Sequence, residues 1–118
     1  MTQNKKMQFG VVSLNRGRHS TAQNMARYAT RAEALGYDFI LVNDHLVFPQ
    51  MEPEGHADKH WTLNHNYFEA LQSCMYLAGL TQRIRIGTSV LVLPYRPPLL
   101  AAKMIATLDV FSGGRFFL

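Results

Sequence analysis

An aspartate and a histidine stand side by side just after a short apolar stretch of the chain. The stretch is Phe39–Val42, and only Asn43 separates it from Asp44 and His45. A histidine titrates near neutral pH, and an adjacent carboxylate can orient the imidazole or stabilise its protonated form. The pair therefore predicts an acid/base function. The simpler alternative is that Asp44 caps a turn and that His45 is a partly buried polar residue.

Three arginines are candidates for binding the phosphate or carboxylate groups of an anionic ligand: Arg16, Arg18 and Arg96. The alternative for each is a solvated loop charge. The chain of 118 residues carries 12 Lys+Arg against 8 Asp+Glu, and its net charge of +4 is compatible with an anionic partner. It contains no dense Lys/Arg run and no nucleic-acid-binding motif, so we expect neither DNA nor RNA as a partner.

A histidine-rich stretch and a single cysteine are weaker candidates. Imidazole and carboxylate can bind a metal ion, and the stretch offers four such side chains: His56, Asp58, His60 and His65. A proline and a glycine just before them disfavour the regular helix that would align His56 with His60, so we expect no metal. The lone Cys74 cannot pair within the chain, and we expect it to be an inert packing residue.

Strands and helices are predicted to alternate along the chain. Apolar runs without strict alternation predict four buried strands, at residues 7–14, 39–42, 84–93 and 115–118. Apolar residues at helical spacing predict three helices between them, at residues 20–35, 66–80 and 97–111. Such alternation indicates a parallel sheet covered by helices, which is an α/β fold.

Capping patterns predict where the helices begin and end. Ser20 and Gln23 have the spacing of a capping box, and Asn66 with Glu69 is a second possible cap pair. Gly36 is placed to end the first helix in a left-handed conformation. The apolar face of the third helix is expected to include Phe111.

Two architectures fit this alternation, a (β/α)8 TIM-type barrel and an open doubly wound sheet. No G-x-G-x-x-G follows the first strand and no phosphate-binding P-loop motif occurs, which favours the barrel. A complete barrel needs about 250 residues. We therefore expect residues 1–118 to be the N-terminal part of one barrel domain, with about four β/α units and a cut in the fourth strand.

Composition sets the class of protein and its compartment. The hydrophobic fraction of 47% can form a core. No apolar run approaches the roughly 18 residues that span a bilayer, and the polar N-terminus does not resemble a signal peptide. We expect a cytoplasmic protein.

In parallel α/β folds, the active site lies at the carboxyl ends of the strands. The Asp-His pair follows the second predicted strand, Ser89 and Val90 lie near the end of the third, and Arg96 comes soon after. These residues should share one edge of the sheet. Arg83 and Arg85 should lie at the opposite, structural end.

Four motifs in register resemble the bacterial luciferase-like superfamily of flavin- and deazaflavin-dependent oxidoreductases. They are Phe39-Ile-Leu-Val-Asn-Asp-His-Leu46, Ile84-Arg-Ile-Gly-Thr-Ser-Val90, Pro97-Pro-Leu-Leu-Ala-Ala-Lys103 and Leu108-Asp-Val-Phe-Ser-Gly-Gly-Arg-Phe-Phe-Leu118. The likeness covers residues 7–118. The Gly-Thr-Ser-Val and Asn-Asp-His pieces are most similar to the branch that uses the deazaflavin coenzyme F420.

The resemblance implies a TIM barrel, a coenzyme F420 or FMN cofactor, and hydride or oxygen chemistry on a small organic substrate. It implies that His45 and Asp44 are catalytic, with His45 as proton donor or acceptor, and that Ser89, Val90, Asp44 and Arg96 contribute to cofactor binding. It also implies a non-prolyl cis peptide bond between Ser89 and Val90. The alternative is a non-catalytic half-barrel that self-associates, and in either case a homodimer is expected.

Overall fold

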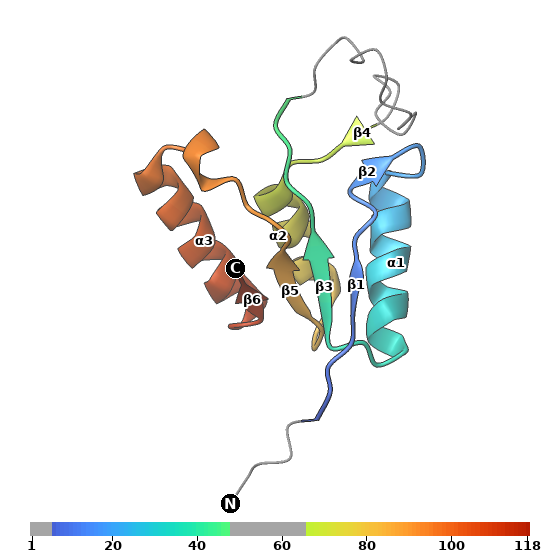
Figure 1. Ribbon diagram of the computed structural model, residues 1–118. Coiled ribbons are helices and arrows are strands. Elements are labelled where there is room, and N and C mark those ends of the chain that lie inside the picture. Colours follow the sequence, from blue (N-terminus) through green and yellow to red (C-terminus); the bar gives the residue numbers. More distant parts are fainter. Residues whose placement is uncertain (1–5, 48–65) are drawn as a thin grey trace, which may run out of the picture.

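The computed structural model describes residues 6–47 and 66–118, in which four parallel strands form one sheet in the order β1-β3-β5-β6 (Figure 1). The strands are β1 (Gly10–Val12), β3 (Phe39–Val42), β5 (Arg85–Thr88) and β6 (Phe116–Phe117). Each strand pairs with the one before it in the sheet, in parallel register. This sequential order is the one expected of successive β/α units of a barrel, because a doubly wound sheet reverses its order at a switch point.

Three helices connect these strands: α1 (Ala22–Ala34), α2 (Ala70–Leu80) and α3 (Pro98–Ser112). Ile40, Val42 and Ile86 belong to the same buried cluster as helix residues such as Leu77 and Leu108, so the helices pack on the sheet face that these strand residues share. The predicted α/β fold with a parallel sheet and flanking helices is confirmed. No helix within the described ranges is long and apolar enough to cross a membrane.

The opposite face of the sheet is formed by aromatic rings that lie over glycines. A Cβ at Gly10 would be 2.0 Å from the ring of Phe39, and a Cβ at Gly87 would be 2.6 Å from the ring of Phe117. The two rings contact each other edge to face, with centroids 6.0 Å apart. Glycine in β1 and β5 therefore makes room for the aromatic side chain of the neighbouring strand.

Charged side chains satisfy backbone groups at the amino end of the sheet. Glu33 Oε1 accepts hydrogen bonds from the N–H groups of Gln82, Arg83 and Ile84, at 2.9, 2.6 and 2.9 Å. Arg115 donates to the carbonyl oxygens that end α2 and precede β5, and to the hydroxyl of Thr81. As predicted, Arg83 lies at this structural end.

Of three local predictions for α1 and α3, two were wrong and one is confirmed. The cap of α1 is Thr21 and not Ser20: the Thr21 hydroxyl accepts the N–H of Asn24 at 3.1 Å. Gly36 does adopt the predicted left-handed conformation, with φ +84. Phe111 lies outside the core and is 71% exposed, because the buried stripe of α3 runs through Ala101, Leu108 and Ser112.

The strand predictions also need correction. β1 and β5 are shorter than expected, and the segment after β5 forms a 3-10 turn, η1 (Leu93–Tyr95). A small antiparallel pair was not predicted: β2 (Arg16–Gly17) pairs with β4 (Asn66–Tyr67). Asn66 therefore belongs to a strand and is not a helix cap.

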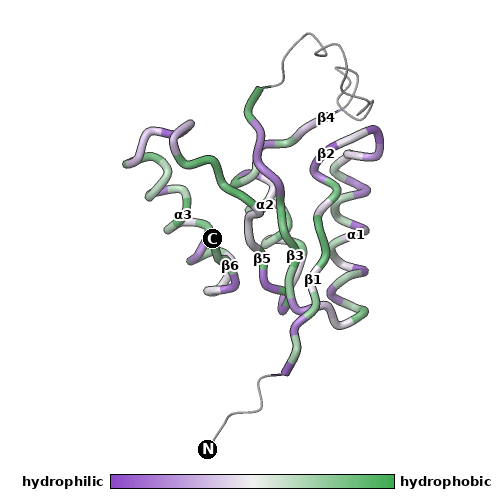
Figure 2. Tube along the Cα trace, in the orientation of Figure 1, coloured by the Kyte–Doolittle hydropathy of each residue, from purple (hydrophilic) through white to green (hydrophobic). Residues whose placement is uncertain are grey.

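The carboxyl end of β3 is a boundary between apolar and polar residues. Figure 2 shows that the apolar colouring of β3 changes to hydrophilic just beyond this end.

Candidate active site

The structure brings the predicted site residues to adjacent strand ends. Val42 of β3 is paired with Thr88 of β5, and the N–H of Ser89 extends this ladder by donating to the carbonyl of Val42 at 2.9 Å. Asp44 and Val90 therefore each lie two residues beyond a paired position, on neighbouring strands. The shared edge follows from the parallel register.

The peptide bond between Ser89 and Val90 is cis, as the resemblance implies. The side chain that follows this bond points out of the core, since Val90 is 69% exposed. Leu46, after β3, is 43% exposed. The edge thus presents apolar surface close to its polar groups.

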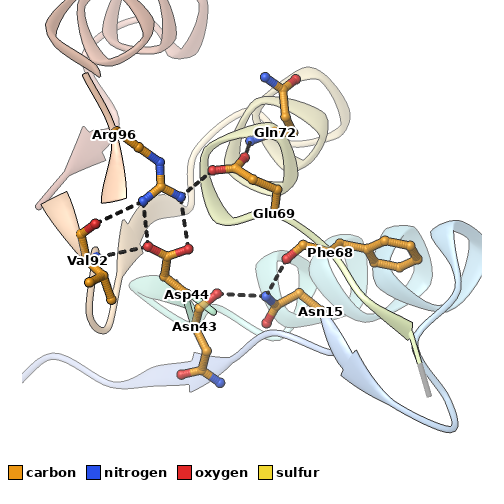
Figure 3. Close-up of polar contacts among 8 residues, drawn as sticks. All are labelled: Asn15, Asn43, Asp44, Phe68, Glu69, Gln72, Val92 and Arg96. Carbon is orange, nitrogen blue, oxygen red and sulfur yellow. Dashed lines mark hydrogen bonds and ion pairs between the residues drawn. The ribbon is translucent and has the colours of Figure 1, made fainter. Parts of the chain in front are cut away.

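Asp44 is held by a bidentate ion pair with Arg96 (Figure 3). The Arg96 guanidinium donates to Asp44 Oδ2 at 2.7 Å and to Oδ1 at 2.9 Å, and the N–H of Val92 donates to Oδ2 at 2.8 Å. The side chain of Asp44 is 0% exposed and that of Arg96 is 7% exposed. Burial raises the pKa of Asp44, but hydrogen bonds from Arg96 and Val92 and the arginine charge outweigh it, so the pKa is lowered overall.

Glu69 extends the pair into a network of three charged residues. One carboxylate oxygen accepts a hydrogen bond from Arg96, and the other accepts the N–H of Gln72 at 2.7 Å, which caps α2 (Figure 3). Hydrogen bonds that Arg96 donates to Asp44 and Glu69 outweigh burial and raise the pKa of Arg96. We call Asp44, Arg96 and Glu69 the charged network.

Asn15, at the end of β1, holds the residue before Asp44. Its amide nitrogen donates to the carbonyl oxygen of Asn43 at 2.8 Å and to that of Phe68 at 3.2 Å (Figure 3). Asn15 is 0% exposed. Its side-chain oxygen, and the side-chain nitrogen of Asn43, are buried and have no hydrogen-bond partner among the described residues.

His45 lies at the surface of this edge, next to an aromatic ring. Its imidazole contacts Tyr67 of β4 edge to face, with ring centroids 5.3 Å apart. Burial raises the pKa of Tyr67, and it stays raised although the charge of Arg16 lowers it. The His45 imidazole is exposed while the carboxylate of the preceding residue is buried.

The remaining candidates lie away from this arrangement. Arg18 is exposed and donates from Nε to Nε2 of its neighbour His19 at 3.0 Å. Burial raises the pKa of the Cys74 thiol to about 12, which makes it inert at neutral pH. The predicted metal ligands lie outside the described residues: His56, Asp58, His60 and His65. In the described part of the chain, no three His, Cys, Asp or Glu side chains are grouped so that they could hold a metal.

Sequence reasoning predicted His45, Asp44, Ser89, Val90 and Arg96 as site residues, and the structure places them near one edge of the sheet, but the link to Glu69 was not predicted. Glu69 was predicted only as the second member of a cap pair with Asn66. A glutamate is the ordinary residue at that place in a capping box, so the sequence held no signal of the link. In the structure, Glu69 itself is the N-cap of α2.

A model of the luciferase-like monooxygenase family matches residues 7–118. The chain belongs to this family. Among curated luciferase-like relatives, it is 36% identical over 97 residues to an F420-dependent glucose-6-phosphate dehydrogenase of Amycolatopsis mediterranei. That alignment covers 81% of the chain but 26% of the relative, so the chain spans about a quarter of the relative's length.

Solved luciferase-like structures share the fold. The F420-dependent tetrahydromethanopterin reductase of Methanopyrus kandleri matches with a TM-score of 0.70 and 24% identity, over 95% of this chain and 26% of that one. An oxygenating Baeyer–Villiger monooxygenase of Pseudomonas putida, in complex with FMN, matches with a TM-score of 0.71 and 21% identity, over 96% of this chain and 29% of that one. These identities establish a common fold and nothing finer.

Proposed function

We propose that the protein is an oxidoreductase that binds coenzyme F420 or FMN at the carboxyl edge of its sheet and acts on a small organic substrate. The observation that carries this proposal is the placement of His45 and Ser89–Val90 on neighbouring strand ends of a luciferase-like chain. Relatives in the family include proteins named for F420 dependence and a monooxygenase in complex with FMN. The cofactor, when bound, supplies hydride transfer or oxygen chemistry.

The residues at this edge fit a planar, partly polar ring. Val90 and Leu46 are exposed and apolar, so they offer surface against which a ring can pack. The buried amide nitrogen of Asn43 has no acceptor in the described part of the chain. A bound group with a carbonyl oxygen would satisfy this donor, whose burial is otherwise unfavourable. Ser89, Val90 and Asn43 are the residues that we expect to hold the ring.

His45 is the group that we propose to donate or accept the proton. Its imidazole is exposed and can therefore reach a substrate, and imidazole is the side chain most often used in general acid–base catalysis. Both carboxylate oxygens of Asp44 accept hydrogen bonds from Arg96, one from each of its two terminal guanidinium nitrogens. Their contribution to catalysis and cofactor binding is therefore proposed to act through the backbone that they hold.

Cofactor binding tests the proposal directly. We expect saturable binding in titrations of the protein with F420 and with FMN, followed by cofactor fluorescence. Val90→Glu should weaken binding about tenfold or more, because it places a negative charge beside an anionic cofactor and removes apolar contact area. Leu35→Glu is the matched control: Leu35 is similarly exposed, at 59%, but lies at the end of α1. It should leave the affinity unchanged.

Two results would overturn the proposal: no binding of either cofactor, or equal weakening by Val90→Glu and Leu35→Glu. His45→Gln separates binding from chemistry. We expect it to keep cofactor affinity within about twofold of the parent protein and to lose F420 reduction with glucose 6-phosphate as a trial substrate, if the parent supports that reaction.

We further propose that residues 1–118 are the N-terminal part of a single barrel domain, and that the protein is a cytoplasmic homodimer. Large apolar side chains exposed on α3 support self-association: Leu99, Val110 and Phe111 are 86%, 74% and 71% exposed. β1 and β6 are the outer strands of the described sheet and could also pair with a second copy. A non-catalytic, self-associating protein is the second candidate function. Light scattering that gives a dimer, together with no cofactor binding, would favour it.

A further inference from the structure

The charged network joins three chain segments that are far apart in sequence. Asp44 follows β3, Glu69 begins α2, and Arg96 follows the turn after β5. Arg96 also donates to the carbonyl oxygen of Val92, at 3.3 Å, so it holds its own turn while it binds the two carboxylates. One guanidinium therefore fixes the relative position of all three segments, in the fork geometry that arginine favours.

Within the network, neither oxygen of Asp44 is accessible for proton exchange with a ligand. Arg96 occupies both oxygens and the N–H of Val92 shares one of them. The side chain is 0% exposed. A carboxylate with this environment is a fixed anion that cannot contact a ligand directly, and the group that it holds in place is the backbone around it.

The backbone before His45 is held from two sides. Asn15 fixes the carbonyl oxygen of Asn43, and Arg96 with Val92 fixes the side chain of Asp44. His45 is the next residue along the chain, and its imidazole is exposed. The same Val92 N–H belongs to the segment that follows Ser89–Val90. The network thus ties the imidazole and the cis-peptide segment to one common anchor.

We propose that Asp44, Arg96 and Glu69 are positioning residues, which hold the His45 imidazole and the Ser89–Val90 segment in one fixed relation at the edge where the cofactor binds. This inference rests on the proposed function for its purpose, but the placement itself can be measured without a cofactor. Precise placement matters because a misplacement of about 1 Å can reduce a reaction rate about 10²-fold.

The test uses the edge-to-face contact between His45 and Tyr67 as a built-in reporter. The ring current of Tyr67 shifts the imidazole proton signals of His45 in an NMR spectrum, and the His45→Gln spectrum identifies those signals among the 5 histidines. In Arg96→Met and in Asp44→Asn, we expect these signals to move toward the position of a histidine in an unfolded peptide. Tyr67→Leu, which removes the ring, gives the full size of that shift.

Glu33→Gln is the matched control. It removes the charge of a carboxylate that accepts three backbone hydrogen bonds at the other end of the sheet, so it destabilises the fold without touching the network. We expect its His45 signals to stay in the parent position. Arg96→Lys keeps the charge but not the fork, and we expect its His45 signals to lie between those of the parent and of Arg96→Met.

Unchanged His45 signals in folded Asp44→Asn and Arg96→Met would overturn the inference, as would an equal shift in Glu33→Gln. If Arg96→Met does not fold, the isosteric Asp44→Asn variant decides the question alone. Titration with F420 and FMN separates this inference from the proposed function. Shifted His45 signals with no cofactor binding in the parent would refute the function only, and unshifted signals with tight binding would refute the positioning only.

Discussion

Removing Arg96 should destabilise the protein in a way that depends strongly on pH. In Arg96→Met, the carboxylate of Asp44 loses both guanidinium hydrogen bonds and keeps only the N–H of Val92, at 2.8 Å. Its side chain is 0% exposed, so water cannot replace the lost partner without rearrangement. Breaking a buried ion pair from one side costs about 3–5 kcal/mol. The second carboxylate, Glu69, is 29% exposed and can turn to solvent, which adds at most about 1 kcal/mol.

The sign of the pH dependence follows from Asp44. In the parent protein, its folded-state pKa is lowered, because the hydrogen bonds and charge of Arg96 outweigh burial. Its stabilising effect is present above the unfolded-state pKa of about 3.9 and is lost as the pH falls through the folded value. In Arg96→Met, burial remains without the cation, so the folded pKa lies above the unfolded one. That variant recovers stability as the pH falls toward about 4.

Urea unfolding followed by circular dichroism at pH 7 and pH 4 measures both effects. The stability difference between the parent and Arg96→Met should be largest at pH 7 and should shrink by at least about half at pH 4. The double variant Asp44→Asn/Arg96→Met buries no charge, and we expect it to be more stable than Arg96→Met at pH 7. A difference that is constant over this pH range, or a double variant less stable than the single one, would refute the reasoning.

Two further variants test the amino end of the sheet and its glycines. Glu33→Gln should reduce the free energy of unfolding by about 1–3 kcal/mol at pH 7 and by much less near pH 3. Burial raises the pKa of Glu33, but hydrogen bonds from three backbone N–H groups lower it overall, so the charged carboxylate stabilises the fold at pH 7. Urea unfolding at the two pH values measures this difference. Gly87→Ala should reduce stability by about 1–3 kcal/mol, because its Cβ would lie 2.6 Å from the ring of Phe117. Gly79→Ala is the control for it, since nothing lies within 4 Å of that Cβ, and in the helix interior it should raise the melting temperature slightly.

The sequence predicted the elements that are set by local patterns. β3 has the predicted bounds because a continuous apolar run lies between polar residues on both sides. The parallel order followed from the alternation of strands and helices. The cap of α1 was misplaced by one residue because Ser20 and Thr21 are both good cap residues, and the hydroxyl chemistry that favours one favours the other.

Features that depend on distant partners could not be predicted in this way. β2 and β4 are two-residue strands that pair across about fifty residues of chain, and neither has a pattern of its own. Arg96 was predicted to contact an anionic ligand because its chemistry fits one. In the structure its anions are Asp44 and Glu69, 52 and 27 residues away in sequence. The charge of Arg96 predicted that it binds an anion, but only the fold shows that the anions are these two carboxylates.

The two ends of the sheet differ in how buried polar groups are satisfied, and this difference supports the proposed cofactor site at the carboxyl end. At the amino end, the charged groups of Glu33 and Arg115 form hydrogen bonds with backbone groups of the neighbouring loops, so that end has a structural function. At the carboxyl end, the three charged side chains of the network pair with one another. The side-chain oxygen of Asn15 and the side-chain nitrogen of Asn43 are buried there without a hydrogen-bond partner in the described residues. Buried polar groups that lack partners are unfavourable in a finished fold. The proposed cofactor would supply such partners at this edge, which also carries His45.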